Sequence, residues 1–160
     1  MDELIQTILD GLTAMLDPQY QEALKLALKK IGTKDRFESE VHAFLADFPS
    51  DTSERVIEFL KERRIINDTR TIQNLLERYS GKRSIGIEKL RAELLERGAP
   101  EETIEAVLIQ HTHGESQRLL DVLSAKFKPS DSRAKAGRFL FSRGFSEDAI
   151  ESALDRFFGN

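Results

Sequence analysis

The feature that most constrains the fold of this chain is a twelve-residue pattern that occurs twice, 46 positions apart. Residues 97–108 read RGAPEETIEAVL and residues 143–154 read RGFSEDAIESAL, with six identical positions. Similarity at a fixed offset is the signature of a repeat protein. A helix, a glycine and a second helix can also follow one another twice by chance, but the shared Arg-Gly pair and Ile-Glu-x-x-Leu spacing favour a true repeat.

Each copy of the pattern predicts two helices joined by a glycine turn. Before the first copy, apolar residues recur at Ile87, Leu90 and Leu94, which is the spacing of one helix face. Gly98 stands where a helix often ends in a left-handed conformation. We therefore expect equivalent turns at Gly98 and Gly144, each with a left-handed backbone that other residues resist.

The rest of the chain predicts more helices of the same kind and no sheet, because no run alternates between apolar and polar residues over more than a few positions. We predict an all-α fold of three tandem three-helix repeats in an elongated, curved array, with a short amphipathic helix at the N-terminus. The expected segments are residues 1–17 (N-terminal extension), 18–66 (a diverged first repeat), 67–112 (second repeat) and 113–160 (third repeat).

Several boundaries follow from local signals inside these repeats. In the first repeat we expect a helix over residues 34–47 and another capped by Ser50 or Asp51. In the third repeat we expect one helix capped by Ser130 or Asp131 and a last helix capped by Ser146.

The N-terminal helix has an apolar stripe that should be covered, since an exposed patch of this kind favours aggregation. We expect it to pack on the first repeat or on a second molecule. The stripe consists of Leu4, Ile5, Ile8, Leu9 and Leu12. Residues 1–17 also hold four acids and no base, and so account for the net charge of −4.

The sequence shows no signal for export, for a membrane or for disulfides. The first residues lack a basic start followed by an apolar run, and no segment approaches 18 apolar residues. The chain has no cysteine, which excludes disulfides and thiolate metal sites and suits a reducing compartment. We therefore expect a cytoplasmic protein that is monomeric and has no membrane partner.

No arrangement of residues predicts catalysis. There is no phosphate-binding Gly-x-x-x-x-Gly-Lys loop, no Gly-x-Gly-x-x-Gly, no cysteine nucleophile and no His-Glu-x-x-His. His111 and His113 lie close together but lack a third ligand, so we expect no metal site. The chain is predicted to be no enzyme, with no cofactor and no small-molecule ligand.

Two basic clusters are the candidate binding residues. Residues 126–143 hold six bases against the single acid Asp131, and a second group lies between residues 82 and 97. These side chains form either ordinary solvated helix faces or a strip that meets DNA phosphates or an acidic groove. Guanidinium groups bind phosphate and carboxylate with two hydrogen bonds, so five arginines rank first: Arg91, Arg97, Arg133, Arg138 and Arg143. The candidates are Lys82, Arg83, Lys89, Arg91, Arg97, Lys126, Lys128, Arg133, Lys135, Arg138 and Arg143.

Nearly the whole chain, residues 18–158, resembles the RecX family. The likeness in the second repeat rests on Gly86, Leu90, Arg91, Glu93, Leu94, Arg97 and Gly98, followed by Ile104 and Leu108. Residues 65–68, IIND, are similar to the family's Leu-Leu-Asp-Asp motif, and residues 143–146 are similar to the start of the last helix of its third repeat. The chain has Asn67 where the family usually has Asp, and Thr71 where it has an aromatic residue.

The resemblance implies a regulator and not an enzyme. Proteins of this family bind the RecA recombinase filament on single-stranded DNA, lie in its groove, block its extension and damp its ATPase and strand exchange. The likeness therefore implies a part in homologous recombination, DNA repair and the SOS response. The RecA filament would be the partner, with single-stranded DNA inside the filament as a further contact. The alternative is a helical-repeat adaptor that binds another protein without a RecA role, which the acidity of the chain favours.

Overall fold

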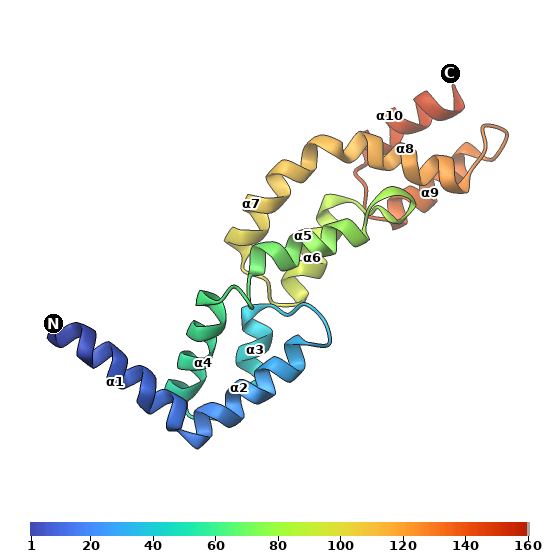
Figure 1. Cartoon of the computed structure of the whole chain (residues 1–160). Helices are drawn as coiled ribbons and strands as arrows, with labels where there is room; N and C mark the ends of the chain where they lie inside the picture. Colours follow the sequence, from blue (N-terminus) through green and yellow to red (C-terminus); the bar gives the residue numbers. More distant parts are fainter. Residues whose placement is uncertain (160) are drawn as a thin grey trace. The chain divides into compact units, whose positions relative to one another are not determined.

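The structure is a computed structural model that describes residues 1–159, without the side chains of residues 13–16. The described chain is helical and has no β-strand, so the predicted all-α fold is confirmed (Figure 1). The elements are α1 (Asp2–Leu16), α2 (Pro18–Ile31), α3 (Glu38–Phe44), α4 (Ser50–Glu62), α5 (Asp68–Arg78), the 3-10 turn η1 (Gly81–Arg83), α6 (Ile87–Glu96), α7 (Glu101–His111), the 3-10 turn η2 (Thr112–Gly114), α8 (Glu115–Lys126), α9 (Arg133–Ser142) and α10 (Glu147–Phe158).

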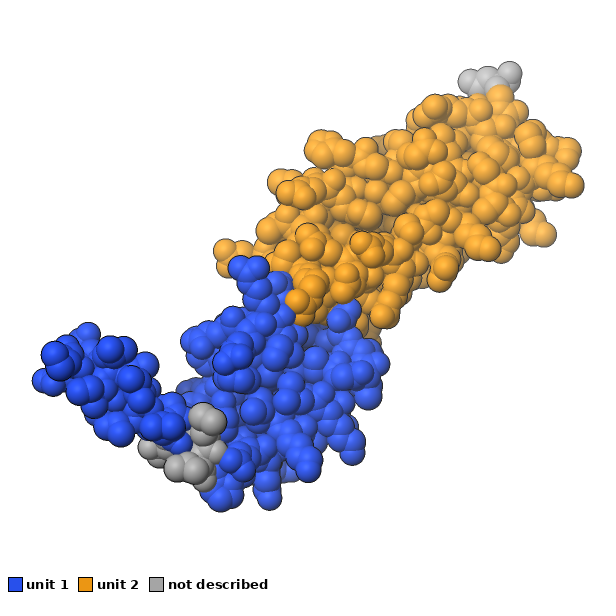
Figure 2. All heavy atoms as spheres, in the orientation of Figure 1, with its two compact units in different colours: residues 1–68 blue, residues 69–160 orange. Residues whose placement is uncertain are grey.

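The chain divides into two compact units, residues 1–68 and residues 69–160 (Figure 2). The predicted division into an N-terminal extension and three repeats is finer than this, and its boundaries stay a prediction.

Unit 1 is organised by the packing of α2, α3 and α4 around one apolar core. The fully buried members of this core include Ala27 on α2, Val41 on α3, Leu45 at the end of α3 and Leu60 on α4. Polar contacts fix the arrangement, because the buried Ser53 hydroxyl donates to the Leu45 carbonyl at 3.0 Å. A small core of this kind positions short helices without any further support from a sheet.

The apolar stripe of α1 is not buried against the first repeat. Leu4, Ile5, Ile8, Leu9 and Leu12 are between 49% and 65% exposed. Of the two expected ways to cover this stripe, packing on the first repeat is therefore not found. Packing on a second molecule stays a prediction.

Three of the predicted local boundaries are wrong and one is confirmed. The helix expected over residues 34–47 is only α3, because Phe37 is fully buried in an extended backbone conformation just before it. Ser50 begins α4 itself and follows Pro49, so neither Ser50 nor Asp51 caps it. Ser132 and not Ser130 or Asp131 caps α9, by accepting the Lys135 N–H. Ser146 does cap α10, by accepting the Ala149 N–H.

Unit 2 begins at the second residue of α5, Thr69, and also contains η1, η2 and helices α6 to α10. Its C-terminal core packs α8 against α9 and α10 through Leu119, Leu123, Leu140 and Ile150. The turn η1 lies against α8, which places residues near Lys82 beside residues near Lys126 although they are far apart in the sequence. This contact brings Lys82 and Arg83 of one basic cluster beside Lys126 of the other.

The two glycine turns have the conformation that the repeat predicts. Gly98 has φ +90° and Gly144 has φ +84°. The following residue closes each turn in the same way: Ala99 N–H donates to the Leu94 carbonyl, and Phe145 N–H donates to the Leu140 carbonyl. The left-handed glycines predicted from the repeated pattern are therefore confirmed.

The second of these turns is held by a distant part of the chain. The Gly86 N–H donates to the Arg143 carbonyl at 2.8 Å. A Cβ atom on Gly86 would lie 1.8 Å from the Gly144 carbonyl oxygen, so no residue with a side chain fits there. The loop between η1 and α6 is thus packed backbone to backbone on the turn between α9 and α10, and we refer to this contact as the clasp.

Candidate functional site

Four cationic side chains surround one cavity of unit 2. Lys82 and Arg83 come from η1, Lys126 from the last turn of α8, and Arg143 from the end of α9. The cavity has a volume of about 500 Å³, and its other lining residues are Val122, Ala125 and Phe139. None of the described residues that line it is acidic. We call this site the basic pocket.

The ring of Phe139 holds two of these cations in place. The Lys126 Nζ atom lies 3.9 Å from the ring centroid, and the Arg143 Cζ atom lies 5.5 Å from it. Both distances are within the range in which an aromatic face attracts a cation. The ring itself is held by an edge contact with Phe127, with centroids 5.7 Å apart. The ring therefore reduces the freedom of two cationic side chains while leaving their charge uncompensated.

The Arg143 guanidinium also has a structural role. One guanidinium nitrogen donates to the Lys82 carbonyl at 2.9 Å. This bond adds to the clasp, because Arg143 also supplies the carbonyl that accepts the Gly86 N–H. Lys89 supports the same region by donating from Nζ to the Ser142 carbonyl at 3.2 Å, near the negative end of α9.

Two of the arginines that rank first by sequence are held in ion pairs between helices. Arg91 on α6 makes two hydrogen bonds to the Glu105 carboxylate on α7, at 2.6 and 3.2 Å. Hydrogen bonds to Glu105 and Glu88 raise the pKa of Arg91 above its usual range. The same bond to Arg91 holds the pKa of the Glu105 carboxyl below its ordinary value. The repeated glutamate thus stabilises a helix pair.

Arg133 on α9 makes a similar contact with α10. One of its guanidinium nitrogens lies 2.6 Å from an Asp155 oxygen and 3.0 Å from a Glu151 oxygen. The pKa of Arg133 is raised, chiefly by the hydrogen bond to Asp155. Glu151 and Glu105 occupy the same position in the two copies of the twelve-residue pattern, and each binds an arginine of the preceding helix. Neither arginine is free to meet a ligand without breaking these bonds.

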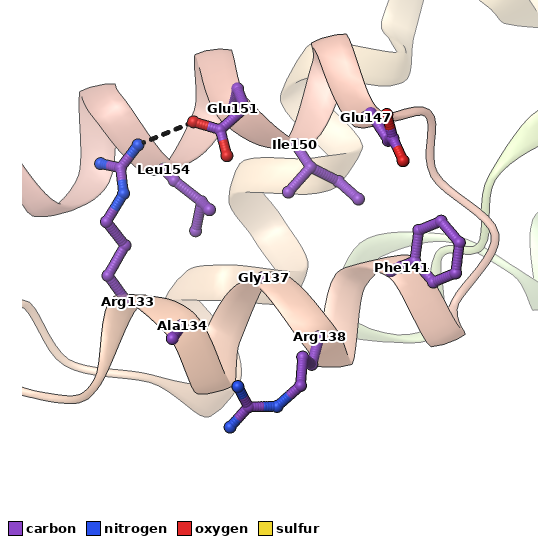
Figure 3. Close-up of a pocket in the computed structure, with 9 residues that line it drawn as sticks. All are labelled: Arg133, Ala134, Gly137, Arg138, Phe141, Glu147, Ile150, Glu151 and Leu154. Carbon is purple, nitrogen blue, oxygen red and sulfur yellow. Dashed lines mark hydrogen bonds and ion pairs between the residues drawn. The ribbon is translucent and has the colours of Figure 1, made fainter.

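A groove between α9 and α10 has mixed charge. Its volume is about 730 Å³, and Figure 3 shows Ile150 and Leu154 facing α9 across it. The groove is lined by Arg133, Ala134, Gly137, Arg138, Phe141, Glu147, Ile150, Glu151 and Leu154. Figure 3 also shows Arg133 reaching Glu151, while Arg138 extends away from α10. Two arginines and two glutamates therefore balance one another here, unlike in the basic pocket.

The structure thus separates the eleven sequence candidates. Four form the basic pocket, Lys89 supports the clasp, and Arg91 and Arg133 are held by acids. Arg138 lines the groove. Arg97 ends α6, while Lys128 and Lys135 are exposed, and none of the three reaches the pocket. The spacing of bases along the sequence could not reveal this division.

Sequence reasoning missed two aromatic rings that each lie against two cations. One is Phe139. The other is Phe44 in unit 1, where the Lys30 Nζ atom lies 5.2 Å and the Arg36 Cζ atom 5.1 Å from the ring centroid. Aligning the repeats would have paired them, since each phenylalanine directly precedes a buried leucine that matches between repeats, Leu45 or Leu140.

The IIND motif has a structural role in unit 1. The Asp68 carboxylate accepts the backbone N–H of Glu38 at 2.9 Å, and so satisfies an open donor at the start of α3. Burial raises the pKa of Asp68 despite this bond. Ile66 is buried in the core of unit 1. Thr71, at the position where an aromatic residue was expected from the resemblance, is also buried.

The described residues hold no group of three or more potential ligands that could bind a metal ion. His111 is half-buried, and burial lowers the pKa of its imidazole. Within the described chain, none of the helices combines the length and the apolar character that a membrane span requires.

Comparison with known proteins finds similar regulatory proteins. The chain is 30% identical over 134 residues to "Regulatory protein RecX" of Herbaspirillum seropedicae, covering 80% of this chain and 86% of that protein. It is 28% identical over 151 residues to a protein of the same name from Chlorobium phaeobacteroides, covering 90% of this chain and 99% of that protein. No family model matches the chain.

The fold is also found in a solved structure. The crystal structure of RecX from Lactobacillus salivarius superposes with a TM-score of 0.68 at 18% sequence identity. The superposition covers 86% of this chain and 96% of that chain. Identity at this level shows a shared fold.

Proposed function

The chain belongs to the RecX family of regulatory proteins, and we propose that it binds the RecA recombinase filament on single-stranded DNA and inhibits filament extension, ATPase and strand exchange. In this role it is a cytoplasmic, non-enzymatic regulator of homologous recombination, DNA repair and the SOS response. The observation that carries the proposal, beside the family, is the basic pocket, because it gathers four cations and has no acid among its described lining residues.

The basic pocket suits a negatively charged partner of defined shape. Lys82, Arg83 and Lys126 present ammonium and guanidinium groups that pair with phosphate or carboxylate oxygens. Phe139 and the Lys82 carbonyl hold Lys126 and Arg143 in position before any ligand arrives. Preorganised side chains lose less conformational entropy on binding, and so contribute more to affinity.

The charge distribution favours a nucleoprotein filament over naked DNA. A chain with a net charge of −4 is repelled by a polyanion at long range. A filament supplies protein contacts besides phosphates, so the favourable contacts need not all be electrostatic. We propose that the four cations of the basic pocket, rather than all eleven sequence candidates, carry the contact in unit 2.

The experiment is a RecA ATPase assay on single-stranded DNA at two salt concentrations. The wild-type protein is expected to inhibit. The triple variant Lys82→Ala/Arg83→Ala/Lys126→Ala should inhibit more weakly, with a salt slope smaller by about 2, since each lost phosphate contact accounts for about 0.7 on single strands. A matched control is Lys25→Ala/Arg78→Ala/Arg156→Ala, which removes three exposed charges outside the pocket and should inhibit like the wild type.

The alternative function is a helical-repeat adaptor for another protein. The exposed apolar stripe of α1 favours it, since such a stripe is a surface for protein contact. If the wild-type protein leaves RecA ATPase and strand exchange unchanged at saturating concentration, the regulator proposal fails and the adaptor remains. Equal inhibition by the pocket variant and the wild type would instead remove the basic pocket from the interface.

A further inference from the structure

The basic pocket gathers more positive charge than the residues around it compensate. Lys82, Arg83, Lys126 and Arg143 come from η1, α8 and the end of α9, and no described lining residue is acidic. None of the four forms an ion pair with another described residue. Like charges around one cavity repel one another, so this arrangement lowers the stability of unit 2. Such a cost is typical of a functional site, where binding offsets it.

Arg143 adds a second cost. Its guanidinium donates to the Lys82 carbonyl, but its Nε atom is buried and has no hydrogen-bond partner among the described residues. A buried donor without a partner is unfavourable. The Phe139 ring attracts Arg143 and Lys126 without supplying a counter-charge. The pocket therefore keeps two of its cations ordered and uncompensated, which is the preorganisation that an anion site needs.

The size of the pocket selects the kind of anion. Its volume of about 500 Å³ lies within the range of about 300–1,000 Å³ that is usual for small-molecule sites. Neighbouring phosphates of a nucleic-acid strand are separated by a sugar, whereas those of a triphosphate group share bridging oxygens. The compact group alone brings several phosphates into one cavity at once, where they can meet cations from three elements.

The remaining lining residues offer little to a nucleoside. They are Val122, Ala125 and Phe139. Val122 is buried, and the ring of Phe139 already lies against two cations. Recognition in this pocket therefore depends on the phosphates, and we expect no selection among bases.

We propose that the basic pocket binds the triphosphate group of a free nucleoside triphosphate, and that the bound group links η1, α8 and the end of α9. The sequence alone predicted no small-molecule ligand. The binding itself goes beyond the proposed function, and only a competition between nucleotide and filament for this pocket rests on it. Because the anion offsets the repulsion among the four cations and binds the folded state, it stabilises unit 2.

The test is isothermal titration calorimetry of the full chain at constant ionic strength, without RecA and without divalent cations. ATP, GTP and inorganic tripolyphosphate should bind with similar dissociation constants. AMP has the base of ATP but one phosphate, and the trinucleotide pTpTpT has three phosphates separated by sugars. Both should bind at least about tenfold more weakly, since losing one hydrogen bond between charged groups accounts for about a factor of ten.

The variant Arg83→Ala/Lys126→Ala should weaken ATP binding at least about tenfold. The matched control is Lys135→Ala/Arg138→Ala, which also removes two exposed cations, neither of which lines the pocket. It should bind ATP like the wild type. Without ligand at low salt, the pocket variant should melt no lower than the wild type, because it carries less repulsion. ATP should raise the melting temperature of the wild type and the control but not that of the pocket variant.

The outcomes separate this inference from the proposed function. Equal ATP affinity of the wild type and the pocket variant overturns the assignment to this pocket. Equal binding of AMP or of pTpTpT overturns recognition of the compact group, and binding of tripolyphosphate without ATP overturns a nucleotide as the ligand. Absence of ATP binding overturns the inference and leaves the regulator proposal untouched. ATP binding by a protein that does not inhibit RecA would leave the inference standing and remove the proposed function.

Discussion

The two flanks of α9 carry similar basic residues but have opposite electrostatic character. On one flank, Phe139 and Arg143 face the basic pocket, where Lys82, Arg83 and Lys126 add charge and no acid among the described lining residues compensates it. On the other flank lies the groove toward α10, where Glu147 and Glu151 balance Arg133 and Arg138. A single helix ten residues long thus separates a cationic surface from a neutral one.

The difference comes from the neighbours that each flank meets. Glu147, Glu151 and Asp155 follow one another at intervals of four, so α10 presents a row of acids. The opposite flank meets η1 and the end of α8, which supply Lys82, Arg83 and Lys126 and no acid to the pocket lining. The side chains that pack beside α9 therefore determine whether one of its arginines is held in an ion pair or is available to a ligand.

The largest effect should come from breaking the clasp that brings η1 to α9. Gly86→Ala places a Cβ atom within 1.8 Å of the Gly144 carbonyl oxygen, and a backbone atom cannot swing away as a side chain can. We expect a loss of at least about 3 kcal/mol in unfolding free energy, measured by urea denaturation. The basic pocket should be lost with it, while the ion pairs of the groove remain.

The control for this substitution is Gly11→Ala in α1. A Cβ atom there meets nothing within 4 Å, and the backbone is helical. The change should stabilise the protein by about 0.5–1 kcal/mol. If Gly86→Ala is tolerated as well as this control, the clasp does not hold the pocket together.

The next effect compares the two glycine turns that the sequence makes equivalent. Both glycines have positive φ, so alanine at Gly98 should cost about 1 kcal/mol. Alanine at Gly144 should cost about 2–3 kcal/mol, because its Cβ atom would also lie 2.5 Å from the Cβ atom of Lys89. Thermal denaturation of the two variants measures the difference. Equal losses would mean that the clasp adds nothing to the turn.

A smaller effect separates the two flanks by their response to salt. Arg133→Ala removes the bonds to Asp155 and Glu151, which are exposed and screened by salt. The resulting loss of stability should be small at low salt and largely disappear at high salt. Lys126→Ala removes one of several like charges, so it should show no such salt-dependent loss. Melting temperatures at the two salt concentrations test this, and parallel behaviour of the two variants would contradict the division of charge.

The smallest expected effect is on the pH dependence of protein stability. Arg91 lowers the pKa of the Glu105 carboxyl from its ordinary value of 4.5, so this group contributes stability above that pH, and the contribution disappears as the pH falls through the lowered pKa. The stability difference between wild type and Glu105→Gln should therefore be seen at neutral pH and vanish in strong acid. The pocket has no acid among its described lining residues, so Arg83→Ala should show no corresponding change. Denaturation across an acidic pH series measures both variants, and a pH-independent effect of Glu105→Gln would contradict the assignment.

Features that depend on neighbours in the sequence were predictable. The spacing of Leu90 and Leu94 placed a buried helix face, and the repeated Arg-Gly pair placed the left-handed turns at Gly98 and Gly144. Helix starts were less certain, because several residues near a boundary can act as caps, as with Ser130, Asp131 and Ser132. Helical periodicity and local hydrogen bonds determine the buried helix faces and the glycine turns. Small differences between nearby polar residues determine which of them caps a helix.

By itself, the sequence determined an all-α chain with glycine turns, apolar helix faces and two basic clusters. Only the tertiary structure decided that Lys82 and Arg83 meet Lys126, that Glu105 and Glu151 hold Arg91 and Arg133, and that Gly86 is needed where two backbones touch. The physical reason is that the two kinds of feature depend on interactions over different separations along the chain. Helical periodicity and turn geometry act over a few residues, whereas the compensation of a charge depends on which side chains packing brings within a few ångströms.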